Sequence, residues 1–428
     1  MGTTVNRATR THYRHVRPAS ADAATGLVAR VYEQLDRDFG MLAPPVALHA
    51  AAPPTLASAW LMLRETLLVN GRVDRAAKEA VAVAVSLANA CPYCVDVHGT
   101  TLHGLIRGRD AAAVADDRFD AVGDPRLRAL ARWARDGGVR PRATGGPSPT
   151  DGPPATGGPS PTDGHPLAGG PPPTAPFPAA QAPELIGVAV TFHYLNRMVH
   201  VFLRESPLPA GLPAVVRRGL GRLVGRLVRP AVQRGREPGT AHALLPAAAP
   251  PVDITWGTGY RRIEDAFGRA IGAVAAAGER SVPEPVRDLV TAELADWDGR
   301  SMPPSRAWVT DAVATLPTRL RPSGRLALLT ALAPYQVGDA VVADFRHAGA
   351  ARPAGTEPSA GTEPSAGTEE LVGGEQLVGG DRDARALVET TAWASLAAAR
   401  RIGGWLADTV PAQRRNSQDA SPAVPMGR

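Results

Sequence analysis

Apolar residues recur along the chain at the three- and four-residue spacing of amphipathic helices. The first stripe consists of Leu27, Val28, Val31, Leu35 and Phe39, and Gly40 follows it as a stop signal. After a bend at Pro44–Pro45, a second helix is predicted to open at Pro53–Pro54 and to run to about Leu68. Asn70-Gly71, a pair typical of helix C-termini, closes it.

A third helix is predicted over residues 75–88, with Asp74 as its N-cap. It is apolar nearly all round, which indicates burial. The alternation of Ala and Val over residues 80–85 would also suit a strand, but the alanines and the helical neighbours favour a helix. Asn89-Ala90 interrupts this helix, and Cys91-Pro92 begins a fourth one with proline at its first position.

Helical patterns continue over residues 185–203, 252–345 and 382–407, and no βαβ unit is visible. The sequence therefore predicts an all-α fold. Residues 211–229 form another candidate helix, which carries five arginines. Such a face could bind anions or a membrane surface, but a solvated helix face is the commoner origin of this pattern.

Composition separates folded from low-complexity parts. A chain of 428 residues exceeds one ordinary core, which predicts two domains or a duplicated one. Glycine (44) and proline (42) are abundant, and a ten-residue unit occurs twice between residues 143 and 164. We predict a disordered basic arm at 1–20, a helical domain at 21–137, a disordered linker at 138–182, a second helical region at 183–410 with a low-complexity insert at 353–381, and a disordered tail at 411–428.

The net charge is +6 and the pI about 9.9, so nucleic-acid binding has to be weighed. The positive charge is almost all arginine, with Lys78 the only lysine, and aromatic residues are not interleaved with it. We therefore predict no nucleic-acid partner. The N-terminal residues lack the apolar segment of a signal peptide, and no run of about 18 apolar residues occurs. These features predict a cytoplasmic protein without a membrane span.

The densest chemical signal is the segment from Cys91 to His98, Cys-Pro-Tyr-Cys-Val-Asp-Val-His. Cysteines at i and i+3 at a helix start lie close enough for a disulfide, whose Cα atoms are about 4.4–6.8 Å apart. The helix N-terminus favours a thiolate and lowers the cysteine pKa from about 8.5. His98 lies four residues after Cys94 on the same helix face, where an imidazole can accept the thiol proton.

Glu79 is the second candidate. It interrupts a helix rich in Ala and Val, where a carboxylate is costly unless it is paired or its pKa is raised. It lies 12 residues before Cys91, a spacing that brings the two together only if the chain breaks at Asn89-Ala90. Glu79 could then relay a proton to His98 or to a leaving oxygen. Taken alone, the residue is explained equally well by a structural ion pair with an arginine.

Other interpretations of the cysteines remain open, because such a pair can be incidental or structural. A closed zinc site needs four ligands, and one short helix carrying Cys91, Cys94, His98 and His103 cannot wrap a metal tetrahedrally. Cys-Pro-Tyr-Cys also resembles a glutaredoxin active site, but that fold places the motif after a strand in a βαβ unit. We therefore predict no metal and no bound cofactor.

Glu79, eleven intervening residues and then Cys91-x-x-Cys94-x-x-x-His98 resemble the core signature of the carboxymuconolactone decarboxylase and alkylhydroperoxidase D-like superfamily. The resemblance covers roughly residues 20–106. It implies an all-α fold that assembles as a homo-oligomer. It also implies that Cys94 is the peroxidatic thiol and Cys91 the resolving one, with His98 and Glu79 in a proton relay. True decarboxylases of the superfamily generally lack the cysteine pair.

The motif and the resemblance together predict a thiol peroxidase of the peroxiredoxin type. Its partners would be a hydroperoxide and an external dithiol reductant, which in the family is often a dihydrolipoyl carrier. Two further residues are candidates for the pocket: Tyr93, which stands where the thiol branch can have histidine, and His193, for which a structural role is the alternative. A general disulfide reductase or redox sensor, a non-catalytic scaffold and a carboxymuconolactone decarboxylase-like lyase are the alternative functions.

The second half contains a degenerate echo of the motif. Ala333-Pro334-Tyr335-Gln336-Val337 mirrors the segment that begins at Cys91, with both cysteines replaced, and Arg321 stands where Glu79 would fall. This pattern predicts a tandem duplication whose second copy has lost its chemistry. Chance similarity over a short helix start is the alternative.

Overall fold

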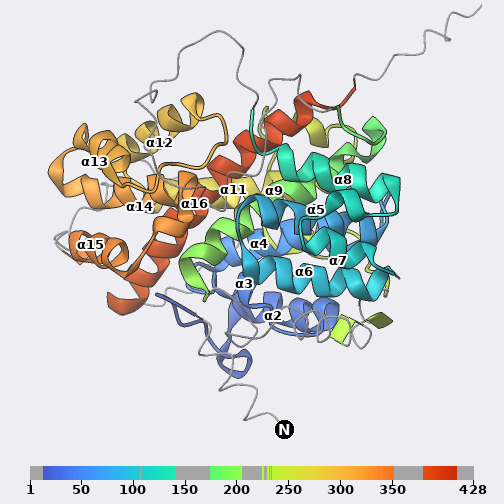
Figure 1. Ribbon diagram of the computed structural model, residues 1–428. Helices are drawn as coiled ribbons and strands as arrows, with labels where there is room; N and C mark the ends of the chain where they lie inside the picture. The colour runs from blue at the N-terminus through green and yellow to red at the C-terminus, as the bar shows by residue number, and fades with distance from the viewer. Residues whose placement is uncertain are drawn as a thin grey trace, which may run out of the picture.

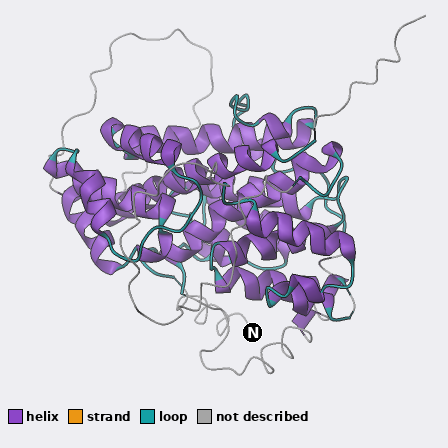
Figure 2. Cartoon of the chain, turned by 45° about the horizontal axis from the view of Figure 1, so that its top comes forward, coloured by secondary structure: helices purple, strands orange, loops and turns teal. Residues whose placement is uncertain are grey.

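Helices and loops make up the computed structural model, which describes residues 13–106, 108–140, 174–204, 224–225, 229–230, 232, 234–350 and 379–411. These ranges contain no β-strand, and an isolated backbone bridge joins Tyr13 to Leu203. Figure 2 shows the helices packed side by side. The predicted all-α class is confirmed.

In the first half, the helices that follow the buried helix of residues 75–88 pack against it. The helices of this half are α2 (Gly26–Phe39), α3 (Pro44–Ala47), α4 (Pro53–Leu63), the π-helical turn η2 (Arg64–Leu68), α5 (Arg75–Ala88), α6 (Pro92–Leu105), α7 (Asp110–Ala115) and α8 (Pro125–Asp136), with short 3₁₀ turns η1 (Ala21–Ala23) and η3 (Phe119–Ala121). Proline occupies the first position of α4, α6 and α8, where its missing N–H costs no hydrogen bond. Gly40 ends α2 in the left-handed conformation (φ 81°), as predicted.

The second half adds further helices, some of which pack against the first half while the others lie to one side of it (Figure 1). They are α9 (Ala182–Phe202), α11 (Arg261–Ser281), α12 (Glu284–Asp296), α13 (Ala307–Ala314), α14 (Arg321–Leu332), α15 (Asp339–Ala350) and α16 (Gly379–Asp408), with 3₁₀ turns η4 (Ala179–Gln181), η5 (His242–Leu244), η6 (Thr255–Gly257), η7 (Thr318–Leu320) and η8 (Pro334–Gln336). Helix α9 is buried along nearly its whole length and packs against both α5 and α16. Figure 1 shows α16 running diagonally across the molecule. One hydrophobic core therefore spans both halves.

Buried charges tie the start of α5 to the second half. Lys78 Nζ lies 2.6 Å from an oxygen of Glu184 on α9, and both side chains are almost fully buried. The same carboxylate accepts a hydrogen bond from the Tyr260 hydroxyl (2.9 Å) and lies 3.6 Å from Arg262 on α11. Burial lowers the pKa of Lys78 and by itself raises that of Glu184, but their attraction holds the Glu184 pKa below its usual range.

The packed chain extends beyond the boundaries predicted from composition. Val16, within the predicted arm, is buried, and Arg14 N donates to Phe202 O (2.7 Å). Phe177, within the predicted linker, is buried edge-on against Trp133, with 4.8 Å between ring centroids. A single buried apolar residue such as Val16 or Phe177 hardly changes the average composition of the segment around it, so composition alone does not predict that it packs. The tandem repeat, most of the arginine-rich segment 211–229 and most of the insert lie outside the described residues.

Two local expectations are corrected. The helix that begins at Pro53 ends at Leu68, as predicted, but its C-cap is Val69 in an extended conformation, so Asn70-Gly71 does not close it. In the predicted second copy, Pro334–Gln336 forms only a 3₁₀ turn, whereas Pro92 opens a 14-residue helix. Arg321 donates to the carbonyls of Leu316 and Ala314 and does not occupy a buried position like that of Glu79. The tandem duplication stays a prediction.

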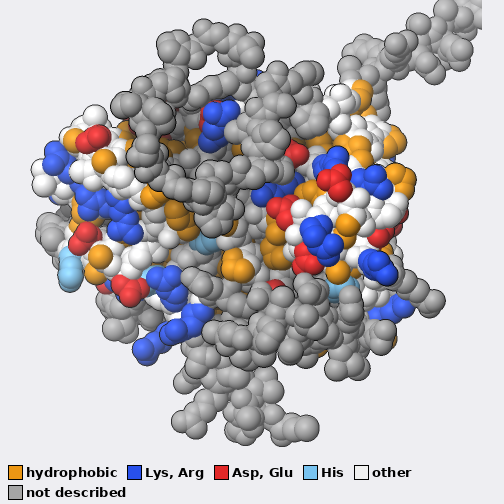
Figure 3. Space-filling view, viewed as in Figure 1, with side chains coloured by type: hydrophobic (Ala, Val, Ile, Leu, Met, Phe, Trp, Pro, Cys, Tyr) orange, Lys and Arg blue, Asp and Glu red, His pale blue; other side chains and the backbone are white. Residues whose placement is uncertain are grey.

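No helix among the described residues is both long and apolar enough to cross a membrane. On the face shown in Figure 3, basic and acidic side chains are interspersed. The absence of a nucleic-acid partner and the assembly into oligomers remain predictions.

Candidate active site

The candidate site lies at the junction between α5 and α6. The side chain of Asp74 caps α5 by accepting from Ala77 N (2.8 Å), as predicted. Helix α5 ends at Ala88, and Ala90 adopts a positive φ of 47°, a conformation that costs energy in a residue with a side chain. Cys91 N then donates to Ser86 O (2.9 Å), which turns the chain back on itself. The predicted break between Glu79 and the cysteines is thus confirmed.

The two cysteines lie at the start of α6. Cys91 is the N-cap residue and Cys94 lies in the first turn. Both are free thiols and both are buried, at 1% and 3% exposure. The Cys91 thiol is close enough to Cys94 to oppose its ionisation, and such proximity is what a disulfide between the two requires.

Glu79, His98 and Arg75 form a chain of charged hydrogen bonds. His98 Nδ1 donates to Glu79 Oε2 (2.7 Å), and Arg75 Nε donates to Glu79 Oε1 (2.8 Å). Burial by itself raises the pKa of Glu79, but Arg75 and His98 outweigh it and hold the pKa below its usual range. An ionised Glu79 can only accept, so it fixes the proton of a neutral His98 on Nδ1 and leaves Nε2 as the basic nitrogen.

The Cys94 thiol departs from the sequence prediction. Burial raises its pKa well above the ordinary value, and the hydrogen bond with Cys91 raises it further. The helix N-terminus was expected to lower this pKa, but its dipole does not compensate for removal of the sulfur from water. Cys94 is therefore a protonated thiol at rest, and a base must take its proton when it reacts.

A narrow apolar cavity of ≈ 70 Å³ opens onto Cys94 and His98. Its walls come from the end of α2, the segment that joins it to α3, and from α3, α4, α6 and α9: Phe39, Met41, Ala43, Pro44, Pro45, Val46, Leu63, Tyr93, Val97, Phe192 and Leu195. The ring of Phe192 lies edge-on to His98, with 4.6 Å between centroids. This pocket brings the thiol and the imidazole to one small space lined almost wholly by hydrocarbon.

Of the two residues predicted for the pocket, the structure brings only Tyr93 to it. Burial raises the pKa of its hydroxyl well above the usual range, so Tyr93 is neutral and does not act as a base. His193 does not line the cavity. Its Nδ1 lies 3.0 Å from the Asn89 amide nitrogen, and burial lowers its pKa well below the usual range.

Asn196 on α9 was not identified from the sequence. Its amide is hydrogen-bonded to Cys94 and favours the thiolate, and Nδ2 also donates to Ser86 Oγ (3.2 Å). Asn89 Nδ2 donates to Asn196 Oδ1 (2.9 Å) and holds the amide in place. Arg75 was missed as well, although its position four residues before Glu79 is the usual spacing of a helical ion pair.

In the described ranges, no group of three or more His, Cys, Asp or Glu is placed to hold a metal ion.

Comparison with known proteins agrees with this geometry. The model of the carboxymuconolactone decarboxylase family matches residues 54–136, which include α4 to α8. The chain belongs to this family, because it is also similar to a known protein over almost the whole length of both chains. That relative, described as alkyl hydroperoxide reductase Rv2159c of Mycobacterium tuberculosis (strain ATCC 25618 / H37Rv), is 35% identical over 394 residues, 92% of this chain and 94% of its own. No solved structure matches the chain.

Proposed function

We propose that the protein is a thiol-dependent peroxidase that reduces organic hydroperoxides. The observation that carries this proposal is the shared pocket of Cys94 and His98, with His98 hydrogen-bonded to Glu79 at 2.7 Å. The name of the relative, an alkyl hydroperoxide reductase, supports peroxidase-like activity in this branch of the family. The apolar walls favour a hydroperoxide with a hydrocarbon substituent over a polar one.

The first step is transfer of the outer peroxide oxygen. His98 Nε2 takes the proton of Cys94, and the thiolate attacks that oxygen. The O–O bond breaks, the leaving alkoxide takes the proton from His98 and departs as the alcohol, and Cys94 becomes a sulfenic acid. Ionised Glu79 stabilises the transient imidazolium through Nδ1.

The second step forms the disulfide. The Cys91 sulfur attacks the Cys94 sulfenic sulfur, its proton combines with the departing hydroxide, and water leaves. An external dithiol then reduces the disulfide by exchange and is itself oxidised. The identity of that dithiol, including a dihydrolipoyl carrier, stays a prediction.

The decisive test is stopped-flow oxidation of the reduced protein by cumene hydroperoxide. Wild type should lose two thiols per chain rapidly, Cys94→Ser should react no faster than a free thiol, and Cys91→Ser should stop at a sulfenic acid. Slow, equal loss in wild type and Cys94→Ser would overturn the peroxidase proposal. A reversible disulfide without fast peroxide consumption would indicate a reductase or sensor, and lactone decarboxylation that survives loss of both cysteines would indicate a lyase.

A further inference from the structure

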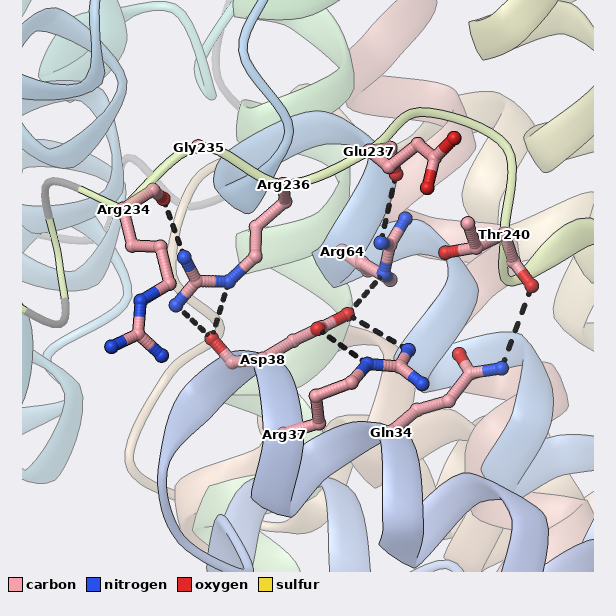
Figure 4. A pocket seen from close by; sticks show the side chains of 9 residues that line it. All are labelled: Gln34, Arg37, Asp38, Arg64, Arg234, Gly235, Arg236, Glu237 and Thr240. Atoms are coloured by element: carbon pink, nitrogen blue, oxygen red, sulfur yellow. Dashed lines mark hydrogen bonds and ion pairs between the residues drawn. The ribbon is translucent and has the colours of Figure 1, made fainter.

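A second hollow lies beside the thiol pocket. Its volume is ≈ 450 Å³, and it is bounded by the end of α2, the start of η2 and the segment 234–240. Figure 4 shows its lining, which includes four arginines: Arg37, Arg64, Arg234 and Arg236. The two pockets adjoin, since Asp38 and Arg64 line this one while their chain neighbours Phe39 and Leu63 line the other.

The lining carries excess positive charge. Its carboxylates are Asp38 and Glu237, so four guanidinium groups minus two carboxylates leave +2 for the lining residues themselves. Glu65 lies behind the lining and pairs with Arg64 at 2.6 Å, so the excess that an anion would meet is smaller than +2 but still positive. Asp38 is already bound by Arg37 (3.0 Å) and Arg64 (2.6 Å). Only the backbone carbonyl of Glu237 faces Arg64, at 2.8 Å, and Figure 4 shows its carboxylate pointing away.

Donor capacity remains unused on this surface. Arg234 is exposed, and its guanidinium donates to no group among the described residues. Within the described ranges, Arg37 donates only through Nε and Nη2, both to Asp38. Burial lowers the pKa of Arg236, while Asp38 attracts its charge and Arg234, Arg75 and Arg64 repel it. Like charges that crowd around an open hollow are relieved when an anion enters it.

We propose that this arginine pocket binds the phosphoryl group of a small molecule. A phosphate anion offsets the excess positive charge, and its oxygens point in several directions, as do guanidinium groups that arrive from three separate segments. A carboxylate would fill one guanidinium fork and leave the others unmatched. The proposal does not rest on the peroxidase chemistry, because binding here uses none of the thiol-site residues.

The test is calorimetric titration of the full-length reduced protein with inorganic phosphate at constant ionic strength. One saturable site is expected, with affinity at least tenfold lower in Arg234→Gln. Arg319→Gln, which removes an exposed arginine on η7, is the charge-matched control and should bind like wild type. Circular dichroism would verify that each variant is folded.

Several outcomes would overturn the proposal: no saturable binding, equal loss in Arg234→Gln and Arg319→Gln, or acetate bound as tightly as phosphate. Binding to phosphatidic acid vesicles without binding of inorganic phosphate would overturn the assignment to a small molecule. None of these results depends on peroxide turnover, so failure here and failure of the proposed function are distinguishable.

Discussion

Cys94 is a weak nucleophile until a base accepts its thiol proton. Burial and the neighbouring Cys91 thiol both oppose ionisation, while Asn196 favours it. The reaction therefore depends on His98, whose basic nitrogen is set by Glu79. Two predictions at the residue scale follow from this arrangement.

The first concerns the ionisation of Cys94. Because its pKa is raised, the thiolate fraction near pH 7 should be smaller than in an unperturbed cysteine. In Cys91→Ser, where burial remains the largest cause, alkylation by iodoacetamide should be slow near pH 7 and should rise only above the pH at which N-acetylcysteine titrates. A midpoint below that of N-acetylcysteine would show that the helix N-terminus dominates after all.

The second concerns Glu79→Gln. Loss of the carboxylate removes the partner that stabilises an imidazolium at His98, so peroxide oxidation near pH 7 should slow by about 10²-fold. The difference in oxidation rate between wild type and Glu79→Gln should shrink as pH rises, since hydroxide can then deprotonate Cys94 directly. Asp120→Asn, which alters an exposed carboxylate, is the control. A rate that is lower than wild type by the same factor from pH 6 to 10 would mean that Glu79 acts only through folding.

At the scale of elements, the turn after α3 is joined to α9 by His49. Tyr194 on α9 donates to His49 Nε2 (2.8 Å), and His49 Nδ1 donates to Val46 O (2.9 Å). Both ring nitrogens are occupied in the neutral form, so protonation would force the tyrosine hydroxyl to turn from donor to acceptor. Burial lowers the pKa of His49 to about 4.

This linkage predicts acid sensitivity. The unfolded chain protonates His49 near pH 6.5 and the folded chain only near 4, so the unfolded state binds more protons between these values and stability falls as pH falls through them. The loss from this residue should reach about 3 kcal/mol. Urea unfolding of wild type and His49→Asn at pH 7 and pH 4.5 checks it. The variant should lose less stability, and equal losses would contradict the assignment.

A second prediction at this scale concerns Gly71, in the segment between η2 and α5. Gly71 lies against Glu184, and a β-carbon there would overlap the carboxylate that pairs with Lys78. Gly71→Ala should therefore lower the free energy of unfolding in urea by about 2–4 kcal/mol. Gly338→Ala, at a site with no atom within 4 Å of the added carbon, should change it by less than about 0.5 kcal/mol. Similar effects of the two changes would refute the close-contact argument.

These elements also show what a sequence can predict. Helix α5, its Asp74 cap and the break before Cys91 depend on local signals, and they were predicted closely. Asn196 reaches Cys94 from about a hundred residues away, and nothing local marks it. The predicted direction of the Cys94 pKa shift was wrong for the same reason. The dipole of α6 is a local feature, whereas the burial that outweighs it comes from α9 and the surrounding core.

At the scale of the whole molecule, the two halves stabilise each other. Helix α9 packs between α5 and α16, and α4 packs against α11. The core is continuous across these contacts. The Lys78–Glu184 pair adds a penalty for separation, since parting the halves would leave a buried charge unpaired. The chain should therefore unfold as one unit.

Leu328→Ala tests this cooperativity. Leu328 is fully buried on α14, far in sequence from the thiols, and its truncation should cost about 2–5 kcal/mol. Cys91 and Cys94 are the only cysteines, so their reaction with a chromogenic disulfide in rising urea reports unfolding of the first half alone. If the halves unfold together, Leu328→Ala shifts the midpoint of thiol exposure by as much as the midpoint of helix loss, while Arg319→Gln shifts neither. Thiol exposure that stays at the wild-type midpoint would mean that the first half is stable alone, and the contacts of α9 and α11 would then position the site without holding it together.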